Sequence, residues 1–217
     1  MFYFKYYVEG TDKYVVVGTT RPETMFGDVA VVVNPKDERY KWLEGKKLIN
    51  PANDEPLQVI YDHYVDIEFG TGAMKCTPAH DPNDYNLGVK YKLDMIVCMN
   101  DDATMNEKAG KYVNLDRYEC RKQLVEEIKE KGLLDHIEEI VHQVGHSERS
   151  DAVIEPRLSK QWFVSMKGLS KASLDMQADE NEKVNFFPPR FEKNFVNWME
   201  GIEDWCISRQ LWWGHRI

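Results

Sequence analysis

Short runs of β-forming residues recur along most of this chain, separated by turns rich in Pro, Gly, Asn and Asp, and this spacing is what most constrains the fold. Residues 29–33 read Val-Ala-Val-Val-Val, and a run with no polar member predicts a strand buried on both faces. The runs at 2–7 and 14–17 flank a Glu-Gly-Thr-Asp turn, which predicts a hairpin. Further strands are expected at 48–50, 57–61, 73–77, 95–99, 137–144 and 152–154.

Helices are expected between these strands and in the last part of the chain. The segment 115–131 is amphipathic and stops at Gly132, and its apolar face would hold Tyr118, Leu124, Val125 and Ile128. Further helices are predicted at 35–43, at 82–91 and from 168 onward, with a break at two consecutive prolines. Many short strands among a few helices predict a mainly β, α+β fold, in which a closed or strongly curved β-barrel carries peripheral helices.

The net charge of −9 argues against a protein that coats nucleic acid, because neutralising many phosphates needs clustered Lys and Arg. A short single-stranded end is still a compatible partner. No apolar run reaches the roughly 18 residues of a membrane span, and the first residues alternate like a strand, unlike a signal peptide. The four cysteines form no Cys-x-x-Cys pair, so reduced thiols and a cytoplasmic location are expected.

No metal site is expected. His142 and His146 are four residues apart, but they lie in a segment that reads as a strand running into a loop. No Cys-x-x-Cys pair or His-Glu-x-x-His motif accompanies them.

Residues 71–85 say most about function. Lys75 and Thr77 lie two apart, so on a strand their side chains face the same way. Asp81 and Asp84 follow in a polar turn at the start of the helix predicted next. A cation, a hydroxyl and two carboxylates therefore converge where a strand ends, and such a group suits a site that binds an ammonium group and a hydroxyl.

Each of these residues also has a structural interpretation. Asp81 and Asp84 precede a helix, and Asp is a common helix cap. Lys75 could be a solvated strand lysine, and Thr77 could be an ordinary β-former. His80 could be a structural histidine fixed by hydrogen bonds.

Six longer motifs span essentially the whole chain. They are 19–24 (Thr-Thr-Arg-Pro-Glu-Thr), 70–72 (Gly-Thr-Gly), 78–85 (Pro-Ala-His-Asp-Pro-Asn-Asp-Tyr), 144–149 (Val-Gly-His-Ser-Glu-Arg), 161–164 (Gln-Trp-Phe-Val) and 204–217 (Asp-Trp-Cys-Ile-Ser-Arg-Gln-Leu-Trp-Trp-Gly-His-Arg-Ile). In these motifs the chain resembles the editing domain inserted in the catalytic core of valyl-tRNA synthetase. Isoleucyl and leucyl relatives share part of the pattern, but Lys75, Asp81 directly after His80, and the Leu-Trp-Trp-Gly-His-Arg ending look valyl.

The resemblance implies a class Ia synthetase editing domain at residues 1–189 and a helical return segment toward the catalytic core at 190–217. It implies hydrolysis of the ester of mischarged Thr-tRNA(Val), a fidelity step of protein biosynthesis. A valine pocket cannot strongly exclude threonine, and about 10²-fold discrimination is the figure established for that family, so a second site must remove the error. The implied partners are the 3′ end of tRNA(Val) carrying threonine and the rest of the synthetase chain, with no membrane.

The resemblance also implies roles for individual residues. Asp84 would bind the α-ammonium group and Asp81 the side-chain hydroxyl, although these two roles could be exchanged. Lys75 and Thr77 would help to bind the hydroxyl, and Lys75 would keep both carboxylates ionised. The other residues expected to bind substrate are the threonine-rich wall and an arginine that could meet a phosphate, namely Thr19, Thr20, Thr24 and Arg21. The candidate catalytic residues are Asp84, Thr24 and His80, with His80 as a possible general base.

Editing implies no cofactor. ATP and Mg²⁺ act in the parent's catalytic core, whose His-Ile-Gly-His and Lys-Met-Ser-Lys-Ser motifs are absent from this sequence. Two alternatives stay open at this stage. The isolated chain could be a tRNA-docking insertion with weak or no catalysis, which its acidic charge favours, or it could serve an isoleucyl or leucyl enzyme.

Overall fold

The computed structural model describes residues 1–210 and 213–215, so Leu211, Trp212, Arg216 and Ile217 of the expected ending lie outside the described residues. Contacts divide the chain into two units, Met1–Leu158 and Ser159–Ile217, and each is described by itself. The functional boundary expected between residues 189 and 190 stays a prediction, because contacts alone do not identify a return segment.

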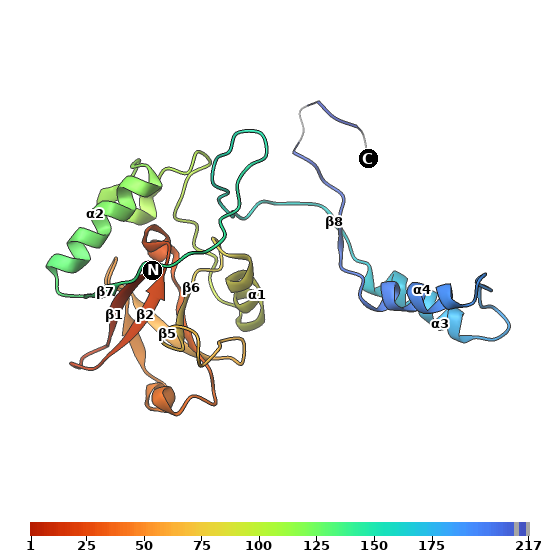
Figure 1. Cartoon of the computed structure of the whole chain (residues 1–217), viewed down its shortest axis with the longest axis horizontal. Coiled ribbons are helices and arrows are strands. Elements are labelled where there is room, and N and C mark those ends of the chain that lie inside the picture. Colours follow the sequence, from red (N-terminus) through yellow and green to blue (C-terminus); the bar gives the residue numbers. More distant parts are fainter. Residues whose placement is uncertain (211–212, 216–217) are drawn as a thin grey trace. The chain divides into compact units, whose positions relative to one another are not determined.

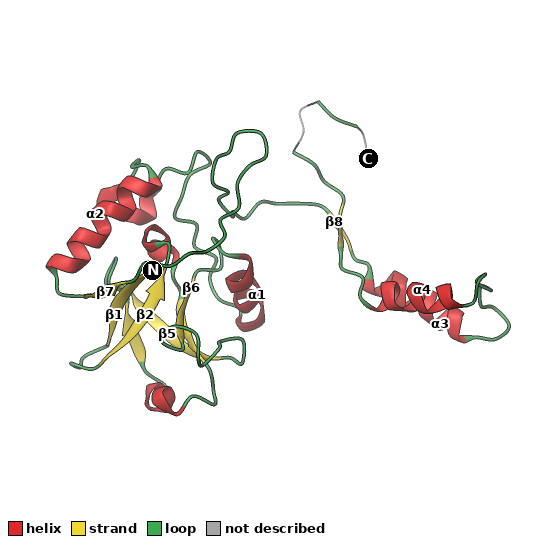
Figure 2. Ribbon diagram, in the orientation of Figure 1, coloured by secondary structure: helices red, strands yellow, loops and turns green. Residues whose placement is uncertain are grey.

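The strands of the first unit form one mixed sheet (Figures 1 and 2). They are β1 (Phe2–Val8), β2 (Tyr14–Thr19), β3 (Ala30–Val33), β4 (Lys47–Ile49), β5 (Pro56–Tyr61), β6 (Ala73–Cys76) and β7 (Leu134–Ile137). Their order is β2-β1-β4-β5-β3-β6, and β7 also pairs with β1. Only β3 and β5 pair in parallel. β2 and β6, at the two ends of this order, lie against each other, so the sheet is nearly closed into a barrel. This confirms the expected curved β fold with peripheral helices.

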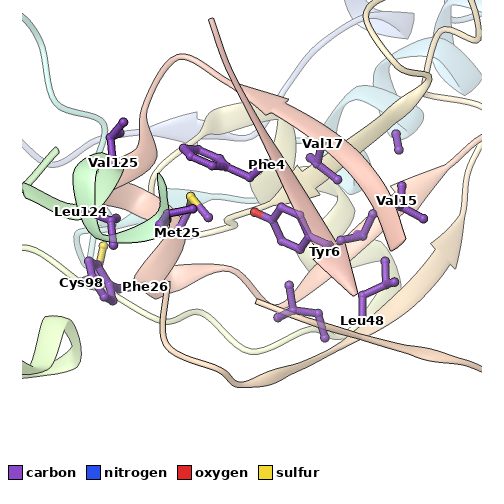
Figure 3. Close-up of a cluster of buried hydrophobic side chains, with 14 of the residues drawn as sticks. Phe4, Tyr6, Val15, Val17, Met25, Phe26, Leu48, Cys98, Leu124 and Val125 are labelled. Carbon is purple, nitrogen blue, oxygen red and sulfur yellow. The ribbon is translucent and has the colours of Figure 1, made fainter. Parts of the chain in front are cut away.

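The central strand β3 is buried on both faces, as its wholly apolar sequence predicts. Val31 and Val33 belong to the main core, which includes Phe4 and Tyr6 of β1 (Figure 3). Ala30 and Val32 face a second, smaller cluster that Leu87 of the first helix helps to form. Each buried valine or leucine side chain contributes roughly 1.5–3 kcal/mol, and β3 contributes side chains to both clusters.

Two α-helices lie on the outside of the sheet (Figure 1). The helix α1 spans Pro82–Tyr91, as predicted, and α2 spans Arg117–Glu130. Three short 3₁₀ helices complete the unit: η1 (Pro22–Gly27), η2 (Glu38–Leu43) and η3 (Glu107–Tyr112). In α2, Leu124, Val125 and Ile128 enter the core as expected, but Tyr118 is largely exposed and Cys120 takes the buried place.

Four expected elements differ from the structure. The helix expected at 35–43 is the shorter η2. Residues 95–99 form no strand, because side chains satisfy their backbone: His80 accepts from the Cys98 N–H, and Asn106 donates to the Val97 carbonyl. The strand expected at 137–144 ends at Ile137, since its pairing with β1 stops there, and 152–154 makes only the single bridge between Val153 and His146.

The described residues of the second unit form two helices and a two-stranded sheet. They are β8 (Phe163–Val164), α3 (Lys167–Ala178), α4 (Arg190–Glu200) and β9 (Trp205–Cys206). The helices α3 and α4 pack against each other, and the predicted break at the two prolines falls just before α4. No helix among the described residues is long and apolar enough to cross a membrane.

Candidate active site

A pocket of about 510 Å³ opens between the end of β2, η1, β6 and the start of α1. The loop at 64–71 forms another wall, and Met1 and Tyr3 at the start of the chain also line the pocket. Every residue proposed from the sequence as catalytic or substrate-binding lines this pocket: Thr19, Thr20, Arg21, Thr24, Lys75, Thr77, His80, Asp81 and Asp84. The sequence therefore located the cavity, although lining a pocket does not by itself assign a role to any residue.

Lys75 of β6 is enclosed by protein partners. Its Nζ lies 3.0 Å from Oγ1 of Thr24 and 2.9 Å from Oδ1 of Asp28, and it also donates to Oγ1 of Thr77. An ammonium group has three N–H donors, so these three oxygens occupy all of them. The side chain is only 10% exposed. The interpretation of Lys75 as a solvated strand lysine is therefore wrong.

Asp28 is the partner that sequence reasoning missed. Its carboxylate accepts from Lys75, from the Thr77 hydroxyl at 2.5 Å and from the Tyr6 hydroxyl at 3.3 Å, and its side chain is fully buried. The sequence did carry a signal, because Asp28 stands immediately before the apolar run that forms β3. A carboxylate at the start of a fully buried strand must itself be enclosed, and it then needs a cation and hydrogen-bond donors.

The pKa values of this pair follow from burial and charge. Burial by itself would lower the pKa of Lys75, but the carboxylates of Asp28 and Asp84 outweigh it and raise that pKa above the usual lysine value. Burial raises the pKa of Asp28, while the Lys75 ammonium and the Thr77 hydroxyl act against the rise. Lys75 therefore keeps its charge at neutral pH, and Asp28 is its direct counter-ion.

Asp84 lies in the first turn of α1 and points back to β6. Its Oδ2 accepts from the Thr77 N–H at 2.7 Å. Burial raises the pKa of Asp84 to about 6, with the nearby Asp81 and Asp28 adding to the rise and Lys75 opposing it. Lys75, which was expected to keep Asp84 ionised, does act against this rise, but it pairs directly with Asp28 and not with Asp84.

Asp81 caps α1. Its Oδ1 accepts from the backbone N–H groups of Asn83 at 2.8 Å and Asp84 at 3.2 Å. This capping geometry satisfies two of the N–H groups that a helix start leaves without partners. The other carboxylate oxygen of Asp81 has no partner among the described residues, so capping and contact with a ligand are compatible.

His80 lines the pocket but is almost fully buried. Its Nε2 accepts from the Cys98 N–H at 3.0 Å, so the neutral ring carries its proton on Nδ1. Nδ1 has no hydrogen-bond partner among the described residues, and the nearest carboxylate oxygen, of Glu155, lies 3.7 Å away. With its only lone pair occupied, the ring has nothing with which to take a proton from water, and this geometry favours a positioning role.

Arg21 joins three parts of the wall. Its Nη1 donates to the His80 carbonyl at 3.0 Å, its Nη2 donates to Glu155, and its Nε lies 3.6 Å from Glu23. The backbone around it is also fixed, because the Arg21 N–H donates to Oγ1 of Thr19 at 3.0 Å. Its side chain is 28% exposed, so part of the guanidinium still faces the pocket.

The loop at 64–71 adds residues that the motifs did not point to. Tyr64, Asp66 and Phe69 line the pocket, and Phe69 is 71% exposed. Gly70 and Gly72 have φ angles of 57° and 74°, a region that favours glycine, so the Gly-Thr-Gly motif shapes this rim. Among the described residues, no group of three or more His, Cys, Asp or Glu side chains could hold a metal ion.

The sequence of the chain also matches a known protein family. The family described as tRNA synthetases class I (I, L, M and V) matches residues 11–217. The chain belongs to this family.

Similar members of the class I synthetases are valine–tRNA ligases, which confirms the valyl resemblance. The enzyme of Oceanobacillus iheyensis is 58% identical over all of this chain, that of Staphylococcus aureus is 55% identical over all of it, and that of Bacillus subtilis is 58% identical over 94%. This chain spans 23–24% of the length of these relatives. Among solved structures, the chain is similar to Agrobacterium radiobacter K84 agnB2 LeuRS in a ternary complex with tRNA and LeuAMS. The match covers 60% of this chain and 19% of that chain, at 21% sequence identity and a TM-score of 0.49. This likeness is too weak to carry an argument.

Proposed function

We propose that this pocket hydrolyses the ester of threonine mischarged on tRNA(Val), as the editing part of a valine–tRNA ligase. The observation that carries the proposal is the convergence of a buried Lys75–Asp28 pair, the Thr77 hydroxyl and the carboxylate of Asp84 on one cavity. Small-molecule sites typically enclose about 300–1,000 Å³, and the volume of this pocket fits an aminoacylated nucleoside.

The ammonium group of the substrate would bind Asp84. Oδ1 of Asp84 has no hydrogen-bond partner among the described residues, while Oδ2 is held by Thr77. Burial has raised the pKa of Asp84, which means that its charged form is poorly stabilised in the pocket. An incoming cation would stabilise that charged form.

The threonine hydroxyl would join the cluster around Lys75. Thr24, Thr77 and Asp28 already share hydrogen bonds there, so a substrate hydroxyl can replace one partner or accept alongside it, with Asp81 at the mouth. The methyl group of valine in the same place would leave buried polar groups without partners. Each such group costs about 1–3 kcal/mol, which would favour release of threonine over release of valine.

Hydrolysis requires a water molecule to add to the ester carbonyl, after which the ribose oxygen leaves as a hydroxyl and threonine leaves as the free acid. An ester is already activated, so positioning and electrostatic stabilisation would supply most of the rate. We assign the positioning of water to Asp84 and Thr24, with Thr19 and Thr20 holding the ester or the terminal ribose. The exposed face of Phe69 offers a surface for a base.

We also propose the partners, the cofactor requirement and the cellular location. The partners would be the 3′ end of tRNA(Val) and the rest of a ligase of which this chain is about a quarter. Editing would need no cofactor, with ATP and Mg²⁺ confined to other parts of that ligase. The free cysteines suit the reducing cytoplasm.

Release of threonine from Thr-tRNA(Val) tests the proposal. The chain should deacylate this tRNA, and Asp84→Asn should lose most of the activity. Asp62→Asn is the matched control, because Asp62 is equally buried, pairs with Lys90 and lies outside the pocket. Binding of charged tRNA without turnover would favour the docking alternative, and equal rates for wild type and Asp84→Asn would reject the assignment of Asp84.

A further inference from the structure

Glu155 is a largely enclosed carboxylate close to the pocket that the proposed mechanism does not use. It comes from the irregular segment 152–158, far along the chain from the pocket residues, and its side chain is 11% exposed. Burial opposes its ionisation, but His80 and two arginine side chains lower the pKa of Glu155 to about 2. Glu155 is therefore a fixed negative charge at physiological pH.

The two oxygens of Glu155 hold two different parts of the fold. Oε2 accepts from Nη1 of Arg117 at 2.6 Å, and Arg117 also donates to the Val153 carbonyl at 3.0 Å. These two bonds already fasten the segment to the start of α2. Oε1 instead accepts from Arg21, which lines the pocket.

Arg21 connects this carboxylate to the turn that carries Asp81, one of the residues proposed to bind substrate. Arg21 donates to the carbonyl of His80, and Asp81 follows directly in the chain. Oε1 of Glu155 also lies 3.7 Å from Nδ1 of His80, the buried polar atom left without a partner. The same oxygen therefore faces both the guanidinium and the ring.

We propose that Glu155 is a positioning residue of the pocket: by holding Arg21, it fixes the His80–Asp81 turn in the geometry that hydrolysis requires. This inference rests on the proposed editing function and deepens it. The segment that carries Glu155 leads directly into the second unit, which begins at Ser159.

The charges predict which kinetic parameter responds. Arg21, Arg117 and Arg121 face Glu23 and Glu155, so the cluster carries one net positive charge, and removing Glu155 would raise it to two. A stronger positive charge attracts tRNA phosphates, so KM should stay the same or fall. Misplacement of reacting groups by about 1 Å can cost up to about 10²-fold in rate, so kcat should fall.

The variant Glu155→Gln separates positioning from attraction. We expect kcat for Thr-tRNA(Val) to fall at least about 10-fold with no rise in KM. Glu148→Gln is the control, because it removes the same charge from an exposed residue nearby. A rise in KM with unchanged kcat would overturn the proposal.

A double-mutant cycle with Arg21→Ala tests whether Glu155 acts through Arg21. In the Arg21→Ala background, Glu155→Gln should change kcat less than twofold. An equal loss of kcat in both backgrounds would show a general structural role and reject the inference. If circular dichroism shows that Glu155→Gln does not fold, Glu155→Asp replaces it under the same criteria.

A readout without substrate keeps this inference separate from the proposed function. In ¹⁵N NMR spectra, the Nε–H signal of Arg21 should be sharp in the wild-type chain and broadened in Glu155→Gln. If wild type releases no threonine, the editing proposal fails, and the Arg21 signal still decides whether Glu155 orders the site. An unchanged signal in Glu155→Gln would overturn the positioning role.

Discussion

The ammonium group of Lys75 lies 2.9 Å from the carboxylate of Asp28, and the protein almost completely encloses both side chains. This pair supports the pocket from the side of the barrel, because Asp28 also accepts from Tyr6 in the main core. A buried ion pair is retained only when further hydrogen bonds satisfy it, and the Thr24 and Thr77 hydroxyls provide them here.

Asp28→Asn should therefore destabilise the fold. The substitution leaves Lys75 buried without its counter-ion, and breaking a buried pair costs about 3–5 kcal/mol. Urea denaturation measures the loss. Glu38→Gln is the control, since Glu38 and Lys41 form an exposed pair and should show no measurable change. An equal midpoint for Asp28→Asn and wild type would contradict the importance of the pair.

Asp84 should make stability depend on pH. Its pKa is about 6 in the folded chain against 3.8 for the free side chain, so the folded state binds the proton more tightly. The stabilisation from this proton is complete below pH 3.8 and is lost as pH rises through about 6. The free energy of unfolding should be measured for wild type and for Asp84→Asn at about pH 4.5 and about pH 7.5. The value for wild type minus the value for Asp84→Asn should be about 2 kcal/mol lower at the higher pH. A flat difference would show that Asp84 has an ordinary pKa.

Asp81 can be tested for its two roles separately. Asp81→Ala removes the cap of α1 and should cost about 1 kcal/mol, whereas Asp81→Ser keeps a capping oxygen and should be nearly neutral. If Asp81 also contacts the threonine hydroxyl, both variants should lose threonine-releasing activity. Full activity in Asp81→Ser would restrict Asp81 to capping.

Salt should weaken tRNA binding only gently. Arg21 and Lys75 are the cations among the described residues that line the pocket, and Lys75 already has three partners. A contact with one or two single-strand phosphates gives a slope of log affinity against log salt no steeper than about −1.5. Fluorescence anisotropy with tRNA(Val) between low and physiological salt measures this slope, and a value several times steeper would require a broad phosphate interface.

Much of this fold could be predicted, because local sequence determined it. The apolar run at 29–33 predicted β3, and Pro82 with the preceding Asp81 predicted the start of α1. The candidate site residues also meet at one pocket, because Lys75 lies in β6, Thr77 directly follows that strand, and Asp81 and Asp84 lie at the start of α1.

The remaining features depend on contacts distant in sequence. Residues 95–99 look like a strand, but His80 and Asn106 take their backbone bonds. The position of Asp28 before an apolar run hints that it is buried, but its pairing with Lys75 and that of Glu155 with Arg21 span 47 and 134 residues of the chain. Such pairings exist only once the barrel closes, so no window of sequence contains them.

The most direct test of the account compares two esters on the same tRNA. The rates at which the chain hydrolyses Thr-tRNA(Val) and Val-tRNA(Val) should be measured side by side, for wild type and for Thr77→Val. We predict that wild type prefers the threonyl ester by at least about 10²-fold, and that Thr77→Val loses most of this preference. Equal rates for the two esters with wild type would contradict the claim that this pocket recognises the threonine hydroxyl.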